Sequence, residues 1–293
     1  MKPAPFEYIA PESLDGALAA LQEHGFDAKL LAGGQSLVPV MNFRLAQPAM
    51  LIDLNPLTAL KYIRHDDATD ELRLGAMTRQ RQLEHSPLVK QHAPLLHETM
   101  PHIAHPQIRN RGTLGGSLAH ADPAAELPVI AVALNGRFHL QSAADDRWIA
   151  AADFFTSLFE TACADNEMLT EVALPPLPPR TGTAFTEMAR RHGDYALAGV
   201  AAVVTLDANQ VCTAARLVYL NLGEIPIVAE TASSILVGHA FSEELVAETA
   251  VSARQAIDPT GDIHATADYK RHLADVLTKR ALRQAFARAA DNY

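Results

Sequence analysis

The amino-acid sequence predicts an α+β protein that is divided into two domains. Helical and strand-like patterns alternate in the first half of the chain, whereas the second half has strands followed by helices. Between the halves, the run "LPPLPPR" at 174–180 has four prolines in seven residues, which favours extended backbone and interrupts helices and central strands. We therefore expect a first domain over 1–177, with parts at about 1–56 and 57–177, and a second domain over 178–293.

The opening part predicts a small open α/β unit. Ser13 can cap a helix over 13–25, and the strand "AKLLA" at 28–32 follows it. A second helix is expected from Ser36, and "AMLIDL" at 49–54 forms the next strand. The resulting order is helix, strand, turn, helix, strand.

The next part predicts a larger mixed unit. We expect strands that alternate apolar and polar residues at 137–143 and 167–175, a further strand at 72–77, and helices from about 78, over 88–100 and over 124–136. This mixture again fits an α/β or α+β arrangement.

The second domain predicts three strands and three helices. The strands are expected at 182–191, 197–208 and 212–223, and the helices at 231–238, 242–257 and 267–290. The last helix is locally basic, and we expect a solvent-exposed face, or alternatively a subunit contact, from its cations Lys270, Arg271, Lys279, Arg280, Arg283 and Arg288.

Composition excludes several classes of function. The 24 Lys and Arg against 34 Asp and Glu give a net charge of −10, which argues against a nucleic-acid binder. Only Cys163 and Cys212 occur, so this chain alone cannot form a cysteine-ligated iron–sulfur or zinc site. The N-terminus lacks the apolar core of a signal peptide, and no apolar run approaches the ~20 residues of a membrane span. We expect a cytoplasmic protein that binds no nucleic acid and has no membrane span.

Two glycine pairs indicate a binding site. Gly33-Gly34 and Gly115-Gly116 each follow an apolar run, and Ser36 and Ser117 come shortly after them. Glycines allow close approach to a ligand and can aim successive N–H groups into one concavity, a nest that binds anions. The serines can add a donor or cap the following helix. Two converging pairs could hold a diphosphate, although each pair could also simply turn the chain.

Neither pair belongs to a common nucleotide motif. The spacing is not G-x-G-x-x-G, and the Lys of G-x-x-x-x-G-K-[ST] is missing. A Rossmann or P-loop site is therefore not expected.

Four segments together carry a family resemblance. They are "AGGQSLVP" (32–39), "RNRGTLGGSLAHADPAAELP" (109–128), "RRHGDYALAGVAA" (190–202) and "ADYKRHLADVLTKRAL" (267–282). In this order and over nearly the whole chain, the sequence resembles the FAD-binding medium subunits of molybdenum hydroxylases, such as carbon monoxide dehydrogenase and xanthine dehydrogenase. The resemblance implies a two-part FAD-binding domain like that of vanillyl-alcohol oxidases, followed by a smaller α+β flavoprotein C-terminal domain.

The resemblance also implies the residues that bind FAD. They are Lys29, Ala32, Gly33, Gly34, Gln35 and Ser36 in the first segment, Thr113, Leu114, Gly115, Gly116 and Ser117 in the second, and Asp122, Glu126 and Tyr195 toward the flavin end. Three of these have structural alternatives: Lys29 as an exposed lysine at a strand end, Asp122 as a helix N-cap before Pro123, and Tyr195 as a buried aromatic.

The function implied by the resemblance is electron transfer. FAD is expected to bind noncovalently, with the molybdenum cofactor on a large partner subunit, a [2Fe-2S] cluster on a small one, and an assembly that is a dimer of heterotrimers. No side chain of this chain is expected to be catalytic. The alternatives are a self-sufficient FAD oxidoreductase that resembles UDP-N-acetylenolpyruvoylglucosamine reductase, and a noncatalytic assembly subunit.

Two further clusters have weaker signals. "HETMPHIAH" contains His97, His102 and His105, but its spacing differs from H-E-x-x-H and Pro101 interrupts the helix, so no metal site is expected. Arg109 and Arg111 could support the FAD phosphates or form salt bridges to another chain, and they could equally be solvated.

Overall fold

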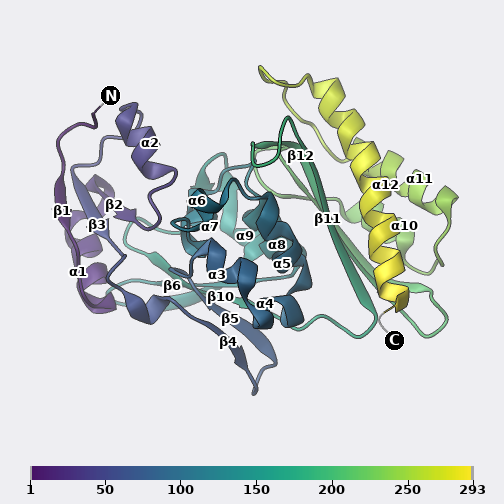
Figure 1. The fold of residues 1–293 in the computed structure, drawn as a ribbon, viewed down its shortest axis with the longest axis horizontal. Coiled ribbons are helices and arrows are strands. Elements are labelled where there is room, and N and C mark those ends of the chain that lie inside the picture. The colour runs from purple at the N-terminus through teal and green to yellow at the C-terminus, as the bar shows by residue number, and fades with distance from the viewer. Residues whose placement is uncertain (1, 292–293) are drawn as a thin grey trace.

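Three sheet-based regions lie side by side along the long axis of the molecule (Figure 1). The structure is a computed structural model that describes residues 2–291. In sequence order, the regions contain sheets of three, five and four strands, and a two-stranded sheet accompanies them. The mixed helix and sheet content confirms the expected α+β class.

The N-terminal region is a small parallel sheet with helices, as the sequence predicts. Its elements are β1 (Glu7–Ile9), α1 (Leu14–His24), the 3₁₀ turn η1 (Gly25–Asp27), β2 (Ala28–Leu31), α2 (Leu37–Asn42) and β3 (Met50–Asp53), with the strand order β1-β3-β2. Ser13 caps α1 as expected, because its Oγ accepts a hydrogen bond from the N–H of Gly16. β1 was not predicted from the sequence, since three residues carry almost no periodicity.

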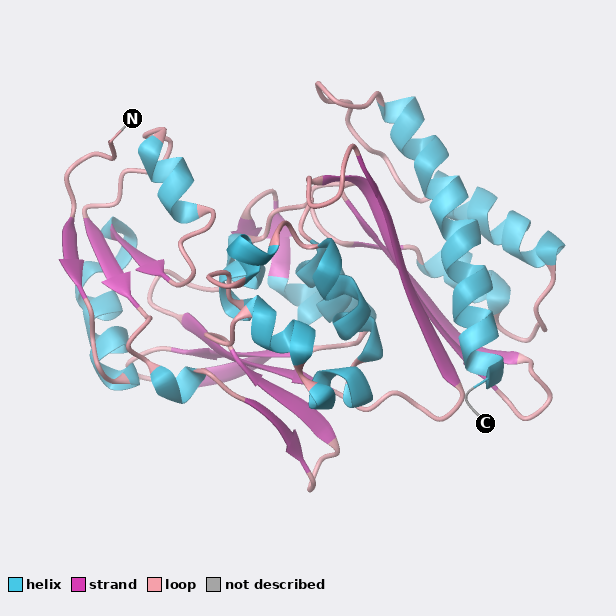
Figure 2. Cartoon of the chain, viewed as in Figure 1, coloured by secondary structure: helices cyan, strands magenta, loops and turns pink. Residues whose placement is uncertain are grey.

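The middle region is an antiparallel sheet that carries helices on one side (Figure 2). Its strand order is β4 (Ile63–Asp66), β5 (Glu71–Gly75), β10 (Met168–Leu174), β6 (Arg137–Gln141) and β7 (Asp146–Ala150). All seven residues of β10 are buried, so the expected alternation at 167–175 was wrong. The reason is that its polar side chains are covered as well: Tyr62 and Arg73 donate hydrogen bonds to the carboxylate of Glu171, which is 8% exposed.

Short helices connect the strands of this region. They are η2 (Thr58–Leu60), α3 (Gln80–His85), α4 (Pro87–His92), α5 (Pro94–Thr99), η3 (Met100–His102), α6 (Pro106–Arg109), α7 (Leu114–His120), α8 (Glu126–Ala133) and α9 (Ala151–Phe154), and β8 (Phe155–Ser157) pairs with β9 (Glu160–Thr161). The single helix expected over 88–100 is divided into α4 and α5 because Pro94 begins a new helix.

The C-terminal region has the predicted order of strands followed by helices. An antiparallel sheet of β11 (Thr181–Ala189), β12 (Ala196–Leu206), β13 (Cys212–Leu220) and β14 (Ile227–Val228) precedes α10 (Glu230–Leu236), α11 (Glu243–Gln255) and α12 (Ala267–Asp291). α12 lies directly on β11: a Cβ added to Gly182 would come within 2.0 Å of the Ala285 carbonyl oxygen. Tyr219 is fully buried beneath α12 and bonds the hydroxyl of Thr278 at 2.5 Å.

The basic face of α12 is partly solvent-exposed, as expected, since Arg280, Arg283 and Arg288 are exposed, but most of its cations also pair with acidic side chains of this chain. Lys270 is only 4% exposed and pairs with Asp262 at 2.9 Å. Arg283 pairs with Glu243 of α11, and Arg288 donates to Glu98 at 2.6 Å. These bonds attach the last helix to its neighbours.

The middle and C-terminal regions share one hydrophobic core. Leu127 and Ile130 of α8 belong to the same buried cluster as Ala201 of β12 and Val218 of β13. Glu98 of α5 also accepts a hydrogen bond from the backbone N–H of Phe185 at 2.8 Å. The proline-rich segment is therefore crossed by extensive packing.

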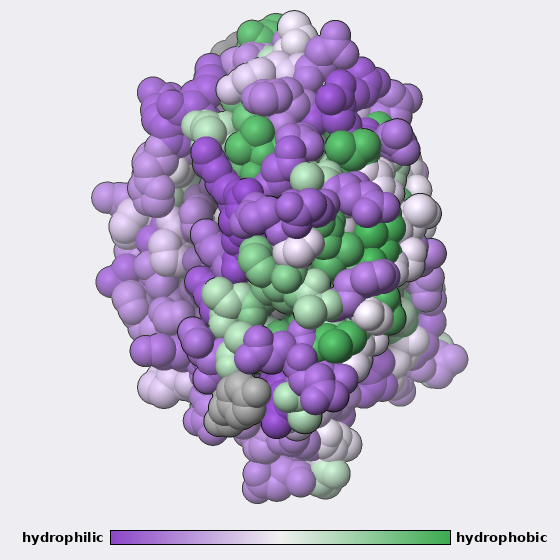
Figure 3. Space-filling view, turned by 90° about the vertical axis from the view of Figure 1, so that its right-hand side faces the viewer, coloured by the Kyte–Doolittle hydropathy of each residue, from purple (hydrophilic) through white to green (hydrophobic). Residues whose placement is uncertain are grey.

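The side of the molecule that carries α12 is hydrophilic at its edges, with hydrophobic side chains gathered near its centre (Figure 3). Exposed hydrophobic side chains of the C-terminal region include Val237, Phe241 and Val251. Within residues 2–291, none of the helices is both long and apolar enough to cross a membrane.

Candidate functional site

The two glycine segments lie against each other. A Cβ built on Gly33 would lie 2.6 Å from the carbonyl oxygen of Arg111 and 2.8 Å from Cα of Gly112, which directly precede the second segment. A Cβ on Gly116 would lie 3.3 Å from Cβ of Ala32. The expected convergence is therefore present, and glycine permits it because any larger residue would separate the two backbones.

The first segment offers free hydrogen-bond donors. Among the described residues, the backbone N–H groups of Gly34, Gln35 and Ser36 have no hydrogen-bond partner. Gly34 has a φ of 72°, and the side-chain amide of Gln35 donates to the Gly33 carbonyl at 3.0 Å, which holds the turn. Consecutive free N–H groups around a left-handed residue are typical of a nest that binds an anion.

Ser36 does not cap α2, which corrects one expectation. It precedes the helix with αR backbone angles, and its side chain makes no capping hydrogen bond. Its hydroxyl thus adds a polar group beside the free N–H groups, while the helix begins without a side-chain cap.

The second segment is the first turn of a helix and not a loop. Thr113 is the N-cap of α7, and its Oγ1 accepts a hydrogen bond from the N–H of Gly116 at 3.1 Å. The N–H of Ser117 donates to the carbonyl oxygen of Thr113 at 3.2 Å, so Ser117 lies inside the helix. Of the two roles expected for Ser117, capping of the helix is therefore excluded, because Thr113 is the cap.

The N–H groups of Leu114 and Gly115 are also engaged. Leu114 donates to the Thr78 carbonyl at 3.0 Å, and Gly115 donates to the Ala76 carbonyl at 2.8 Å. A Cβ on Gly115 would lie 2.6 Å from Cβ of Ala76. This glycine pair therefore does not form a second nest, and its role in the structure is to allow close packing of α7 against the chain after β5.

Arg79 connects the two segments, and the sequence analysis did not identify it. Its guanidinium donates to Oδ1 of Asn55 at 2.5 Å and to the carbonyl oxygen of Arg111. Asn55 in turn donates to the carbonyl oxygen of Ala32 at 2.9 Å. Asn55 directly follows the strand predicted at 49–54, and no sequence signal relates it to Arg79.

Arg79 and Arg111 place two positive charges at the site, although the chain as a whole is acidic. Burial and the neighbouring charge of Arg111 lower the pKa of Arg79, while Asp53 acts in the opposite direction. A bound anion would relieve the repulsion between these two guanidinium groups. The convergent backbone, the free N–H groups and the two cations all fit a diphosphate.

A second group of predicted residues lies where α8 meets the C-terminal region. Glu126 is only 7% exposed, and burial, together with the charges of Glu187 and Asp122, raises its pKa to about 8. Oε2 of Glu187 has no hydrogen-bond partner within the described part of the chain. This raised pKa favours the protonated form of the Glu126 carboxyl at neutral pH.

Tyr195 and Asp122 line a shallow hollow of about 330 Å³ between these regions. Tyr195 is 67% exposed, so the alternative of a buried aromatic was wrong. Partial burial of its hydroxyl and the charges of Asp122 and Glu126 raise its pKa. Asp122 accepts a hydrogen bond from the N–H of Ala124 and does not cap α8, whose N-cap is Ala125, so the capping alternative was also wrong.

The remaining candidates have structural environments. Lys29 is exposed on β2 with its ammonium 6.0 Å from the Phe26 ring centroid. Arg109 is 4% exposed and forms a bidentate pair with Glu84. Its guanidinium is therefore neither solvated nor available to a phosphate. Arg111 is exposed. His102 lies 3.2 Å from Glu187 and packs its ring edge against Phe185.

Comparisons with known proteins define the class. Residues 4–177 match the family described as FAD binding domain in molybdopterin dehydrogenase, and residues 183–285 match the CO dehydrogenase flavoprotein C-terminal domain. These matches make the chain an FAD-binding flavoprotein of the oxidoreductase class.

Full-length relatives give the family. The chain is 43% identical over 99% of its length to the 6-hydroxypseudooxynicotine dehydrogenase complex subunit alpha of Paenarthrobacter nicotinovorans, covering 97% of that protein. It is 40% identical to the carbon monoxide dehydrogenase medium chain of Hydrogenophaga pseudoflava, covering 99% of this chain and all of that one. The chain belongs to the FAD-binding medium subunits of molybdenum hydroxylases, as the resemblance predicted.

Solved structures confirm the expected fold. Carbon monoxide dehydrogenase from Hydrogenophaga pseudoflava, in a form that lacks the Mo-pyranopterin moiety of the molybdenum cofactor, matches with a TM-score of 0.95 at 39% identity, covering 98% of this chain and 99% of that one. Quinoline 2-oxidoreductase from Pseudomonas putida 86 matches with a TM-score of 0.93 at 36% identity and 99% coverage of both chains.

Proposed function

We propose that this chain binds FAD noncovalently with the diphosphate between the two glycine segments. The observation that carries the proposal is the group of free N–H donors at Gly34, Gln35 and Ser36, close to a segment that Arg79 holds in place. Each charge-assisted hydrogen bond contributes about 1.5–3 kcal/mol, so three such bonds approach the ~8 kcal/mol of a micromolar complex. The contacts proposed are those of Lys29, Ala32, Gly33, Gly34, Gln35 and Ser36, and of Thr113, Leu114, Gly115, Gly116 and Ser117.

Asp122, Glu126 and Tyr195 are assigned to the flavin end of the cofactor. Their support is the hollow lined by Asp122 and Tyr195 beside the protonated carboxyl of Glu126. Tyr195 offers an exposed aromatic ring, and Glu126 offers a proton at its carboxyl. In this assignment, residues 1–177 form the FAD-binding domain, in parts 1–56 and 57–177, and residues 178–293 complete the flavin end from the C-terminal domain.

The proposed activity is transfer of electrons from a [2Fe-2S] partner subunit to an external acceptor. FAD supplies this chemistry when bound, because a flavin exchanges electrons singly or in pairs. The two cysteines support an external iron–sulfur source: burial raises the pKa of Cys163 to about 12 and that of Cys212 to about 11, so neither is a thiolate ready to bind iron. Two cysteines also cannot supply the four thiolates that ligate a [2Fe-2S] cluster.

The assembly follows from the same proposal. A large subunit carries the molybdenum cofactor and oxidises the substrate, a small subunit carries [2Fe-2S], and two such heterotrimers associate in the cytoplasm. Relatives named as a medium chain and as a complex subunit support this arrangement. The role of this chain is to bind the flavin, orient it and set its electrostatic surroundings.

The visible spectrum of the purified native complex and of this chain alone tests the proposal. FAD released from this chain without covalent attachment, beside separate chains that contain molybdenum and [2Fe-2S], is the expected result. A colourless chain that still joins its partners would replace the proposal with a noncatalytic assembly subunit. A yellow chain that turns over an organic substrate without partners would replace it with a self-sufficient oxidoreductase.

A further inference from the structure

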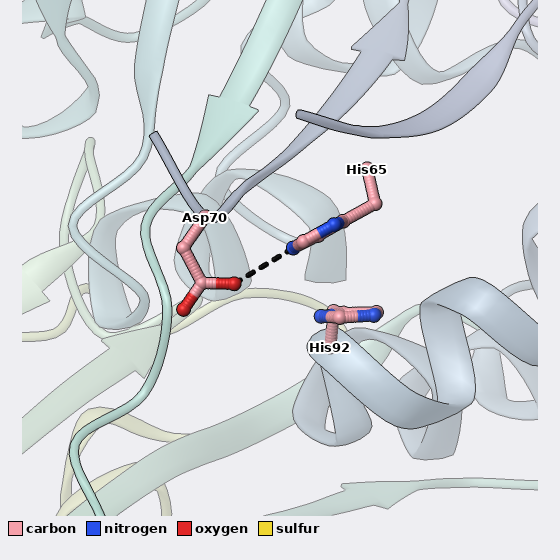
Figure 4. Close-up of side chains that lie close together, drawn as sticks. All are labelled: His65, Asp70 and His92. Atoms are coloured by element: carbon pink, nitrogen blue, oxygen red, sulfur yellow. Dashed lines mark hydrogen bonds and ion pairs between the residues drawn. The ribbon is translucent and has the colours of Figure 1, made fainter. Parts of the chain in front are cut away.

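A group of histidine and aspartate side chains lies far along the sheet from the glycine segments. His65 is on β4, Asp70 is in the turn between β4 and β5, and His92 is the last residue of α4. Figure 4 shows the Asp70 carboxylate pointing at a ring nitrogen of His65, with the His92 ring lying nearly parallel beside it. One ligand atom from each residue lies within 4.8 Å of the other two. Within the described residues, this is the one such group that could hold a metal ion.

We propose that His65, Asp70 and His92 bind a divalent transition-metal ion of the Zn²⁺ type. Two imidazoles and one carboxylate are the donor set that such ions prefer, whereas Ca²⁺ and Mg²⁺ prefer oxygen donors alone. Three protein ligands leave one coordination position to water, which suits a site at the surface. The side chain of Asp70 is 66% exposed, so an ion can enter directly from solvent.

The surroundings of His65 orient it for coordination. Its Nδ1 lies 3.0 Å from Oδ1 of Asp67, and its Nε2 lies 2.7 Å from Oδ1 of Asp70. A carboxylate on the far nitrogen fixes the tautomer of a ligating histidine and aims the other nitrogen at the metal. Asp67 takes this orienting role, and Nε2 is the coordinating atom.

His92 supplies a second nitrogen that is otherwise unused. Its ring stacks on that of His65 with centroids 4.2 Å apart and planes at 26°. Within the described residues, neither ring nitrogen of His92 has a hydrogen-bond partner, and the side chain is half-buried. A partly buried imidazole without a hydrogen bond is better satisfied by a metal than by the stacking contact alone.

The rearrangement that the ion requires is small. Bonds of about 2.0–2.1 Å in tetrahedral geometry place ligand atoms roughly 3.4 Å apart. The 2.7 Å contact between His65 and Asp70 must therefore open slightly, and any separation between about 3.4 Å and the upper bound of 4.8 Å must close. Asp70 belongs to a surface turn and His92 to a helix end, so rotation of their side chains suffices. The bound ion would fasten the tip of the β4–β5 hairpin to α4.

Zinc titration of the full chain tests this site independently of flavin. After treatment with a chelator, the wild-type chain is titrated with Zn²⁺ by calorimetry, and then with Co²⁺ while its visible absorption is recorded. We expect one Zn²⁺ per chain, and at least tenfold weaker binding in His92→Gln and in Asp70→Asn. Asp70 has a φ of 57°, which asparagine tolerates, so Asp70→Asn preserves the turn and the hydrogen-bond acceptor.

The matched control is His85→Gln, on the helix α3 that precedes α4. His85 ends α3 as His92 ends α4, and it is exposed and outside the group, so His85→Gln should bind Zn²⁺ as the wild type does. The Co²⁺ absorption should disappear in His92→Gln and in Asp70→Asn and persist in His85→Gln. Absence of Zn²⁺ binding by the wild type would overturn the proposal. Equal affinity in the wild type and both site variants would overturn it as well, because the ion would then be bound adventitiously elsewhere.

Discussion

Gly33→Ala is the sharpest perturbation of the proposed FAD site. The added Cβ would stand 2.6 Å from the Arg111 carbonyl oxygen, about 0.8 Å short of an ordinary contact of 3.4 Å, and the opposing atom is backbone that cannot rotate away. The two glycine segments must therefore separate. Overpacking of this kind costs ~1–3 kcal/mol of folding stability, which leaves the chain folded with a melting temperature a few degrees lower.

The effect on FAD follows from the displaced donors. If the separation breaks one charge-assisted hydrogen bond to the diphosphate, the loss is about 1.5–3 kcal/mol, and the Kd for FAD rises by roughly 10- to 100-fold. Titration of the flavin-free chain with FAD, followed by flavin fluorescence, measures this change, and circular dichroism measures the fraction folded.

Gly16→Ala is the matched control within the same region. Its Cβ would meet Oγ of Ser13 at 3.1 Å and no backbone atom closer than 3.4 Å outside its own helix, and Ala favours helix α1. FAD affinity should stay at the wild-type value. A folded Gly33→Ala chain that binds FAD as tightly as wild type would refute the location of the diphosphate between the segments.

Four further variants test the remaining features. Arg79→Lys should weaken FAD binding about tenfold in the same titration, because one ammonium cannot replace a guanidinium that reaches two acceptors, and unchanged affinity would remove Arg79 from the site. Glu126→Gln tests a pH dependence: the folded chain holds a proton that the unfolded chain releases between pH 4.5 and about 8, so stability falls as pH rises through this window, by at most ~1.4 kcal/mol per unit. Urea unfolding should show that the free energy of unfolding of Glu126→Gln, relative to that of the wild type, increases as pH rises through this window. A difference that is the same at every pH would contradict the raised pKa of Glu126. Arg109→Met should cost ~1.5–3 kcal/mol in the same unfolding assay, because Glu84 loses its bidentate partner and keeps only Arg81 at 3.7 Å, and a loss below ~1 kcal/mol would show the pair to be dispensable. Tyr195→Ala should change the flavin potential more than FAD retention, and an unaltered potential and reduction rate would exclude contact with the flavin.

Local signals in the sequence predicted most of the architecture. Ser13 began α1 because a capping hydroxyl acts within one helical turn, and the prolines at 174–180 ended β10 before β11 because proline cannot continue either element. The single helix expected over 88–100 was divided, although Pro94 was visible. The glycine pairs marked the candidate site, since unusual backbone freedom is a property of the residue itself.

The short and central strands were poorly predicted because their patterns depend on neighbours. β1 has three residues and is defined by its pairing with β3, 41 or more residues later in the chain. β10 lost its alternation because side chains from elsewhere in the chain, Tyr62 and Arg73, also bury its polar Glu171. Pairing partners of this kind cannot be read from a short window of sequence.

The sequence by itself determined the family, the order of the elements and the two glycine segments. Only the tertiary structure decided which N–H groups are free: those of Gly34, Gln35 and Ser36 are, whereas the donors of Leu114 and Gly115 bond to the chain after β5. Hydrogen-bond satisfaction depends on which distant carbonyls the fold brings near, and no local pattern encodes this. The same reason explains the connection through Arg79, the proton on Glu126 and the grouping of His65 with His92, because each arises between segments that meet only after folding.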